Sequence, residues 1–149
     1  MDVLITLENA QISEDGEEKK IELIAVGECQ WKEDGTLELS YPDSEITGFS
    51  GSKTIIRVTP EMLVTVTRGG LIVSNLTMEE GKKHYNLYRT PFGEMLLGIQ
   101  AKKLYMERRE NGGILRLHYV VDTNALIISE DHIELTWEEQ PKHVAQESL

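Results

Sequence analysis

Apolar and polar residues alternate along most of this chain, in short runs separated by turns. Val3–Gln11 and Lys19–Lys32 are the first two runs. In the second, the odd positions from residue 21 onward are apolar or small: Ile21, Leu23, Ala25, Gly27, Cys29 and Trp31. Alternation with a period of two is typical of a half-buried β-strand. A glycine within the apolar row indicates a bend or a close approach of another backbone at Gly27.

The clearest turn signal is the Gly69-Gly70 pair, which lies between the alternating runs Met62–Arg68 and Leu71–Met78. A type I′ turn needs positive φ at both central residues, which glycine adopts without steric cost. A two-residue turn also fixes the register of the hairpin. The register predicts three facing pairs: Arg68 with Leu71, Val66 with Val73, and Val64 with Asn75.

Further short runs continue the pattern to the end of the chain. The predicted strands are Thr36–Tyr41, Ser52–Thr59, His84–Arg89, Glu94–Arg108, Ile114–Val121, Leu126–Ser129 and His132–Trp137. Asp43–Ser52 is expected to be a loop or a broken strand. Thr90-Pro91-Phe92-Gly93 and Asn111-Gly112-Gly113 are predicted turns. Ala101–Arg109 is rich in good helix formers, so a short helix remains open there.

The pattern therefore predicts an all-β domain of roughly eight to ten antiparallel strands over residues 1–138. Residues 139–149 are polar, contain Pro141, and are expected to be a flexible tail. Such a sheet protects its edges either by closing into a barrel or by stacking two sheets. A barrel of about eight strands has room inside for side chains or for one small ligand.

Charge and cysteine content narrow the partners and the compartment. The net charge of −11 and the isoelectric point near 4.8 argue against nucleic acid and against a membrane surface as partners. Cys29 is the single cysteine, which excludes an intramolecular disulfide and suggests a reducing cytoplasm. The first residues lack the basic region of a signal peptide. The longest apolar run, Met95–Ile99, is too short for a membrane-spanning helix.

Several turns and strands resemble one family of small bacterial proteins. The residues that carry the resemblance are Gly48, Ser52–Val58, Arg68-Gly69-Gly70, Met78-Glu79-Glu80-Gly81, Thr90-Pro91-Phe92-Gly93 and Gly113–Tyr119. Together they resemble the YwiB-like family over nearly the whole chain. The resemblance implies a closed, calycin-type, lipocalin-like β-barrel in the cytoplasm of a Gram-positive bacterium. It implies no activity and no catalytic residues. The Gly-x-Trp signature of lipocalins is absent, since Gly27 and Trp31 have a different spacing.

Residues that commonly carry chemistry show no catalytic pattern, so an enzyme is the least favoured class. The four histidines are His84, His118, His132 and His143, and none lies two or four residues from another, so no local metal pair is predicted. His118 alternates with Arg116 on a polar face and is expected to be solvated. A haem barrel would need His84 or His118 inside. Cys29 is expected to be a buried, inert thiol. No cofactor or metal is predicted.

Arg68 is the candidate binding residue, because the predicted register places it at the end of an apolar row. Its structural interpretation is an ion pair at the barrel rim, or a side chain that extends its charge to water. Its functional interpretation is an anion-facing group at the mouth of a cavity, assisted by Tyr88 and Tyr119. The favoured hypothesis is therefore non-catalytic binding of a small apolar or amphipathic molecule.

The alternative hypothesis is a structural or interaction protein with a filled barrel. A homodimer would be its simplest form. The residues that support it are apolar positions predicted to face outward: Leu4, Ile24, Val26, Ile56 and Ile72.

Overall fold

The computed structural model describes residues 1–42, 52–69, 73–124 and 126–140, which form ten antiparallel strands and no helix. The strands are β1 (Asp2–Ser13), β2 (Glu18–Trp31), β3 (Leu37–Pro42), β4 (Lys53–Val58), β5 (Val64–Gly69), β6 (Val73–Met78), β7 (Lys83–Thr90), β8 (Gly93–Arg109), β9 (Gly112–Thr123) and β10 (Leu126–Glu139). The predicted all-β class and number of strands are confirmed. Within these ranges no helix is long and apolar enough to cross a bilayer.

The strands follow one another around a closed barrel. Each pairs with the next along the chain, and β10 returns to pair with β1. This closing seam runs from the Val3–Glu139 pair to the Ser13–Ser129 pair. The seam between β6 and β7 is much shorter, with pairing only at Val73–Arg89 and Ser74–Tyr88. Closure leaves no exposed sheet edge, which resolves the choice between barrel and stacked sheets.

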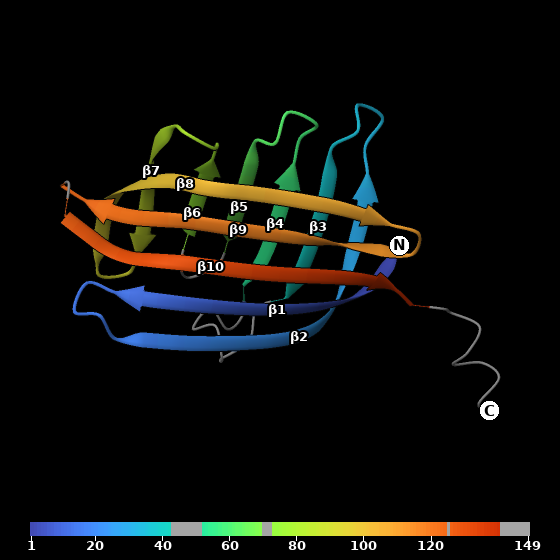
Figure 1. Cartoon of the computed structure of the whole chain (residues 1–149), viewed down its shortest axis with the longest axis horizontal. Helices are drawn as coiled ribbons and strands as arrows, with labels where there is room; N and C mark the ends of the chain where they lie inside the picture. The colour runs from blue at the N-terminus through green and yellow to red at the C-terminus, as the bar shows by residue number, and fades with distance from the viewer. Residues whose placement is uncertain (43–51, 70–72, 125, 141–149) are drawn as a thin grey trace.

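The barrel is flattened into two layers. The long strands β1, β2, β8, β9 and β10 lie side by side in one layer, and the shorter β3–β7 cross behind them (Figure 1). β2 belongs to both layers, because it pairs with β1 as far as Glu28 and with β3 from Glu28 to Trp31. Gly27 lies next to this change of partner, as the bend predicted there requires.

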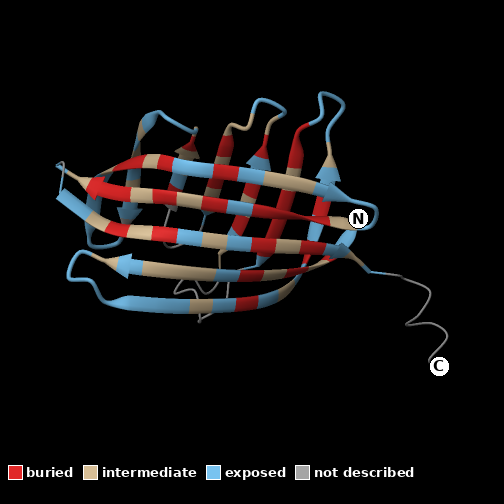
Figure 2. Cartoon of the chain, in the orientation of Figure 1, coloured by how far each residue is buried: buried red, intermediate tan, exposed pale blue. Residues whose placement is uncertain are grey.

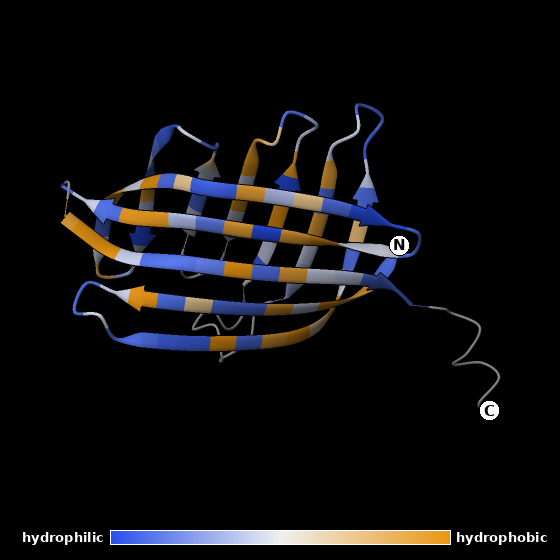
Figure 3. Ribbon diagram, viewed as in Figure 1, coloured by the Kyte–Doolittle hydropathy of each residue, from blue (hydrophilic) through white to orange (hydrophobic). Residues whose placement is uncertain are grey.

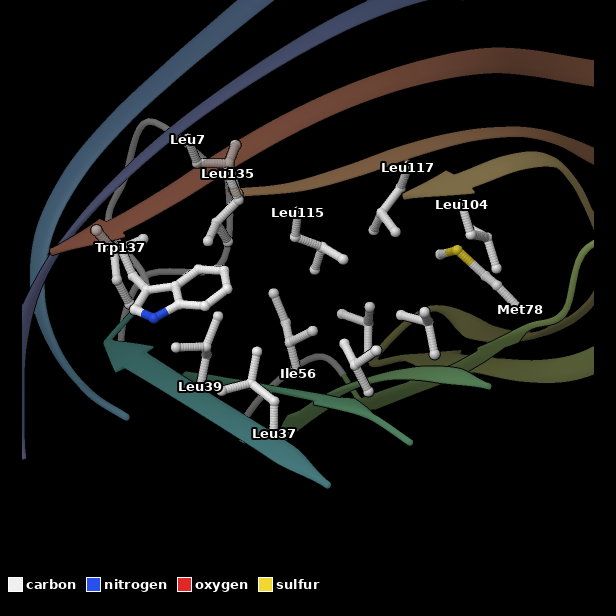
Figure 4. Close-up of a cluster of buried hydrophobic side chains, with 14 of the residues drawn as sticks. Leu7, Leu37, Leu39, Ile56, Met78, Leu104, Leu115, Leu117, Leu135 and Trp137 are labelled. Atoms are coloured by element: carbon white, nitrogen blue, oxygen red, sulfur yellow. The ribbon is translucent and has the colours of Figure 1, made fainter. Parts of the chain in front are cut away.

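Alternation along each strand separates the core from the surface. Buried and exposed residues alternate along the long strands (Figure 2), and apolar residues follow the same alternation (Figure 3). One end of the interior is filled with large side chains, among them Trp137, Leu37 and Leu39 (Figure 4). The apolar row predicted at the odd positions of β2 is therefore its core-facing row.

The predicted register of the β5–β6 hairpin is wrong. Each β5 residue pairs three positions further along β6 than expected. The observed pairs are Arg68 with Ser74, Val66 with Leu76, and Val64 with Met78. The connection is thus longer than two residues, although residues 70–72 themselves lie outside the described part. An odd shift exchanges the faces of a strand, so Ser74, Leu76 and Met78 take the inner positions.

Several further expectations are corrected or limited. Ala101–Arg109 lies within β8, so the helical alternative is wrong; Ala101 and Leu104 are buried in the core instead. Ile56 is 3% exposed and faces inward, contrary to the outward prediction, because Thr54, Ile56 and Val58 form the buried row of β4. Residues 43–51 of the predicted loop and residues 141–149 of the predicted tail lie outside the described ranges. β10 extends to Glu139, one residue past the predicted domain end.

Candidate ligand cavity

A cavity of about 500 Å³ occupies the half of the barrel away from Trp137, which is not among its lining residues. All ten strands contribute to its wall, which is mainly apolar. The same strands supply both halves of the interior. On β10, for example, Ile133 and Leu135 line the cavity, and Trp137 two residues later fills the closed end. The interior is therefore packed at one end and hollow at the other.

The three residues predicted to bind a ligand all line this cavity. Arg68, Tyr88 and Tyr119 come from β5, β7 and β9, which are far apart along the chain. The Nε of Arg68 donates a hydrogen bond to the Thr54 hydroxyl at 3.0 Å. Tyr119 is 5% exposed, and Tyr88 is half-buried. The cavity brings them together; their role in binding stays a prediction.

Asp131 is a buried acidic residue of the cavity wall that the sequence analysis missed. It is 4% exposed and lies opposite Gln11 on β1 and opposite Tyr119 on β9. Burial raises the pKa of its carboxyl, and hydrogen bonding by Gln11, Tyr119 and Ser129 partly offsets that rise. Burial, followed by the nearby Asp131 charge, also raises the pKa of the Tyr119 hydroxyl well above its ordinary value.

Two acceptor atoms on this wall have no hydrogen-bond partner among the described residues. They are Oδ1 of Asp131 and Oδ1 of Asn9. A buried polar atom without a partner costs about 1–3 kcal/mol, so native proteins satisfy such atoms with protein groups, water or a ligand. The wall of the cavity therefore offers acceptors to a molecule that can donate hydrogen bonds.

A signal for Asp131 was present in the sequence. Asp131 has the same parity as Ile133, Leu135 and Trp137, the apolar residues that alternate with polar ones in the predicted strand His132–Trp137. The predicted pattern, however, has two separate strands, Leu126–Ser129 and His132–Trp137, with Glu130 and Asp131 between them. The structure has one continuous strand with a register shift between Ile127 and Ser129, and Asp131 falls in its inner row.

The remaining candidates lie outside the cavity wall. Cys29 is buried, and desolvation raises the pKa of its thiol, as expected for an inert cysteine. No histidine of the described ranges lines the cavity, so this part of the chain offers no axial ligand to a haem there. His118 lies on the outer face of β9, directly opposite His132 of β10. Spacing along the sequence could not reveal this pair, because the two residues lie on different strands. His143 lies outside the described residues.

Together, the closed ten-strand meander and its half-hollow interior define a small, closed antiparallel β-barrel protein. The chain belongs to the family described as "Domain of unknown function (DUF1934)", whose model matches residues 5–135. The crystal structure of the ywiB protein from Bacillus subtilis shares the fold, with a TM-score of 0.81 and 21% identity over 94% of this chain and 92% of that chain. The expected YwiB-like relationship is thus confirmed. No curated protein matches the sequence.

Proposed function

We propose that this protein binds a small amphipathic molecule inside the barrel. The observation that carries the proposal is the cavity of about 500 Å³, with a mainly apolar wall and few polar groups. Ligand sites typically have volumes of about 300–1,000 Å³ and this kind of lining. A cavity of this size also speaks against the alternative hypothesis of a filled barrel.

The distribution of polar groups suggests how such a molecule would lie. Arg68, Tyr119 and Asp131 supply a cation, a hydroxyl and a carboxyl group on one part of the wall. Leu97, Met78 and Leu115 belong to its apolar part. A ligand with an apolar body and a hydrogen-bonding head would bury the body among the aliphatic side chains. Its head would then face the polar groups, including the acceptor of Asp131 that lacks a partner.

Filling the cavity is expected to weaken binding of an amphipathic probe. Leu97 lines the cavity and is half-buried, so Leu97→Trp adds an indole to the space that a ligand would occupy. We expect the affinity for anilinonaphthalene sulfonate to fall at least tenfold, about 1.4 kcal/mol. Fluorescence titration of the full chain measures this affinity, and thermal denaturation confirms that the variant is folded.

The adjacent residue provides the matched control. Leu96 is 56% exposed on the opposite face of β8, so Leu96→Trp should leave the affinity unchanged. Equal affinities of wild type and both variants would place the dye on the surface and refute the proposal.

A second experiment tests the polar end of the cavity. Arg68→Gln should weaken binding of the sulfonate dye more than binding of neutral phenylnaphthylamine. Arg57→Gln, on the exposed side of β4, should leave the affinity for both dyes unchanged.

A homodimer is the second proposal, with another copy of this chain as the partner. Ile24 and Val26 are 70% and 56% exposed on β2, and Leu4 lies opposite Val26. Ile56 is buried, so it does not contribute to the patch that the sequence suggested, and Ile72 lies outside the described residues. Size-exclusion chromatography with light scattering should give a dimer that the Ile24→Lys, Val26→Lys double variant dissociates. Ile127→Lys, at an exposed position on β10, should leave the dimer intact. A monomeric wild type would contradict it.

We also propose that the protein is located in the cytoplasm. It is supported by Cys29, which is buried and is the single cysteine of the sequence, so no disulfide can form within it. Immunodetection in fractionated cells, with cytoplasmic and secreted marker proteins, tests it.

A further inference from the structure

Three metal-ligating side chains gather on the outer face of the barrel, away from the cavity. His118 of β9 and His132 of β10 are directly opposed in the antiparallel register. Glu130 lies two residues before His132 on the same strand and therefore on the same face. A cross-strand pair plus a neighbour at the second position forms a compact triangle of side chains on a rigid sheet.

The side chains in this triangle converge on one point. The imidazole rings stack with their centroids 3.8 Å apart and an interplanar angle of 21°. Oε2 of Glu130 lies 2.5 Å from Nε2 of His118 and 3.7 Å from Nε2 of His132. All three candidate ligand atoms lie within 4.8 Å of one another. Ligand atoms around a tetrahedral zinc ion lie about 3.4 Å apart, so modest side-chain rotations would suffice.

We propose that His118, Glu130 and His132 form a binding site for a divalent first-row transition metal such as Zn²⁺. Two imidazole nitrogens and one carboxylate oxygen form a donor set that such ions prefer, whereas Mg²⁺ and Ca²⁺ prefer oxygen donors alone. The side chains are 30%, 40% and 49% exposed for His118, Glu130 and His132, so they can rotate without disturbing the core.

Charges around the triangle would both repel and attract a bound cation. Lys103 is paired with His118 in the β8–β9 register, and the positive charge of Lys102 acts on Glu130. Both lysines are exposed, where water and salt weaken their repulsion of a cation. The net charge of −11 attracts cations to the molecule as a whole.

Three protein ligands leave one coordination position open. His118 and His132 also line a groove of about 590 Å³ on the outer face, together with Tyr105 and Arg116. A bound ion would therefore be accessible to a water molecule or an anionic group from this groove. Zinc sites with three protein ligands and an open position differ in this respect from closed structural sites.

Titration of the chelator-treated full chain with Zn²⁺ alone tests the site by calorimetry. We expect one ion per chain, and we expect weaker binding as the pH falls, because protonated imidazole cannot ligate a metal. Loss of an outer partner of a metal ligand already weakens binding about 10–100-fold. His132→Gln or Glu130→Gln should therefore weaken Zn²⁺ binding by more than about 100-fold. Cobalt substitution supplies a second readout, since ligand-field absorption reports nitrogen and oxygen donors directly.

His84→Gln is the matched control, because His84 lies 3.3 Å from the Glu79 carboxylate but has no second histidine opposite it. It should bind Zn²⁺ as the wild type does. The proposal is overturned if the wild type binds no Zn²⁺, if His132→Gln and Glu130→Gln bind as tightly as the wild type, or if His84→Gln weakens binding equally. Circular dichroism of each variant establishes that the barrel is intact; these partly exposed positions are expected to tolerate substitution.

Discussion

Replacing Trp137 by alanine is expected to lower the free energy of unfolding by about 3–5 kcal/mol. Trp137 is 3% exposed and packs among Leu37, Leu39 and Leu135 at the filled end of the barrel (Figure 4). Its ring also lies against Gly113, where a Cβ would come within 2.5 Å of Cη2. Truncation leaves a hole that no neighbour can fill, since the surrounding strands are fixed by closure of the barrel. Urea denaturation followed by far-ultraviolet circular dichroism measures the loss.

Trp31→Ala removes the same side chain from a less buried position and serves as the control. Trp31 is only partly buried, with the Arg108 guanidinium 4.1 Å from its ring centroid. Its truncation should cost about 1 kcal/mol, in the range of exposed cation–π contacts and ordinary substitutions. Equal losses for the two variants would show that Trp137 is not the main packing element of the closed end.

Gly27→Ala is expected to destabilise the protein by about 1–3 kcal/mol, the usual cost of overpacking. A Cβ on Gly27 would collide with the Ser40 carbonyl oxygen of β3 and lie 2.7 Å from Cδ1 of Ile5. The Ile5 methyl can move, but the β3 carbonyl belongs to the backbone. Because β2 changes layers beside this residue, the substitution pushes the layers apart where they join. Thermal denaturation of wild type and variant gives the change.

The matched control is Gly69→Ala at the end of β5. Nothing lies within 4 Å of a Cβ built on Gly69, and its φ is not in the left-handed region. The free energy of unfolding of the Gly69→Ala variant should stay within about 0.5 kcal/mol of that of the wild type. If Gly27→Ala leaves the stability equally unchanged, the close approach of β2 to β3 does not require a glycine. The role assigned to Gly27 at the layer junction is then wrong.

The sequence alone predicted the strands and most of the core, because alternation is strong where one face of a strand is buried. It failed where alternation is ambiguous or where geometry depends on a turn. Ile55 and Ile56 are adjacent and both apolar, so parity could not decide which faces inward. The β5–β6 register was inferred from an assumed two-residue turn, and the longer connection shifted every pair by three positions.

The candidate site was predictable in part. Arg68 could be assigned to the inner row from β5 alone, and Tyr119 from the alternation of β9. That these residues share a wall with Asp131 depends on pairing between strands distant in sequence, which local patterns do not encode. The His118–His132 pair was missed for the same reason, since its members are fourteen residues apart, beyond any local spacing rule.

Pairing of β1 with β10 has a consequence for biosynthesis. Strand β1 can pair with β2 early in translation, but its other edge stays unpaired until β10 emerges from the ribosome. Until then the nascent chain exposes a long strand edge, the kind of surface on which chains aggregate or which chaperones cover. Folding of the barrel should therefore complete only after β10 has been translated, in one late step that closes the ring.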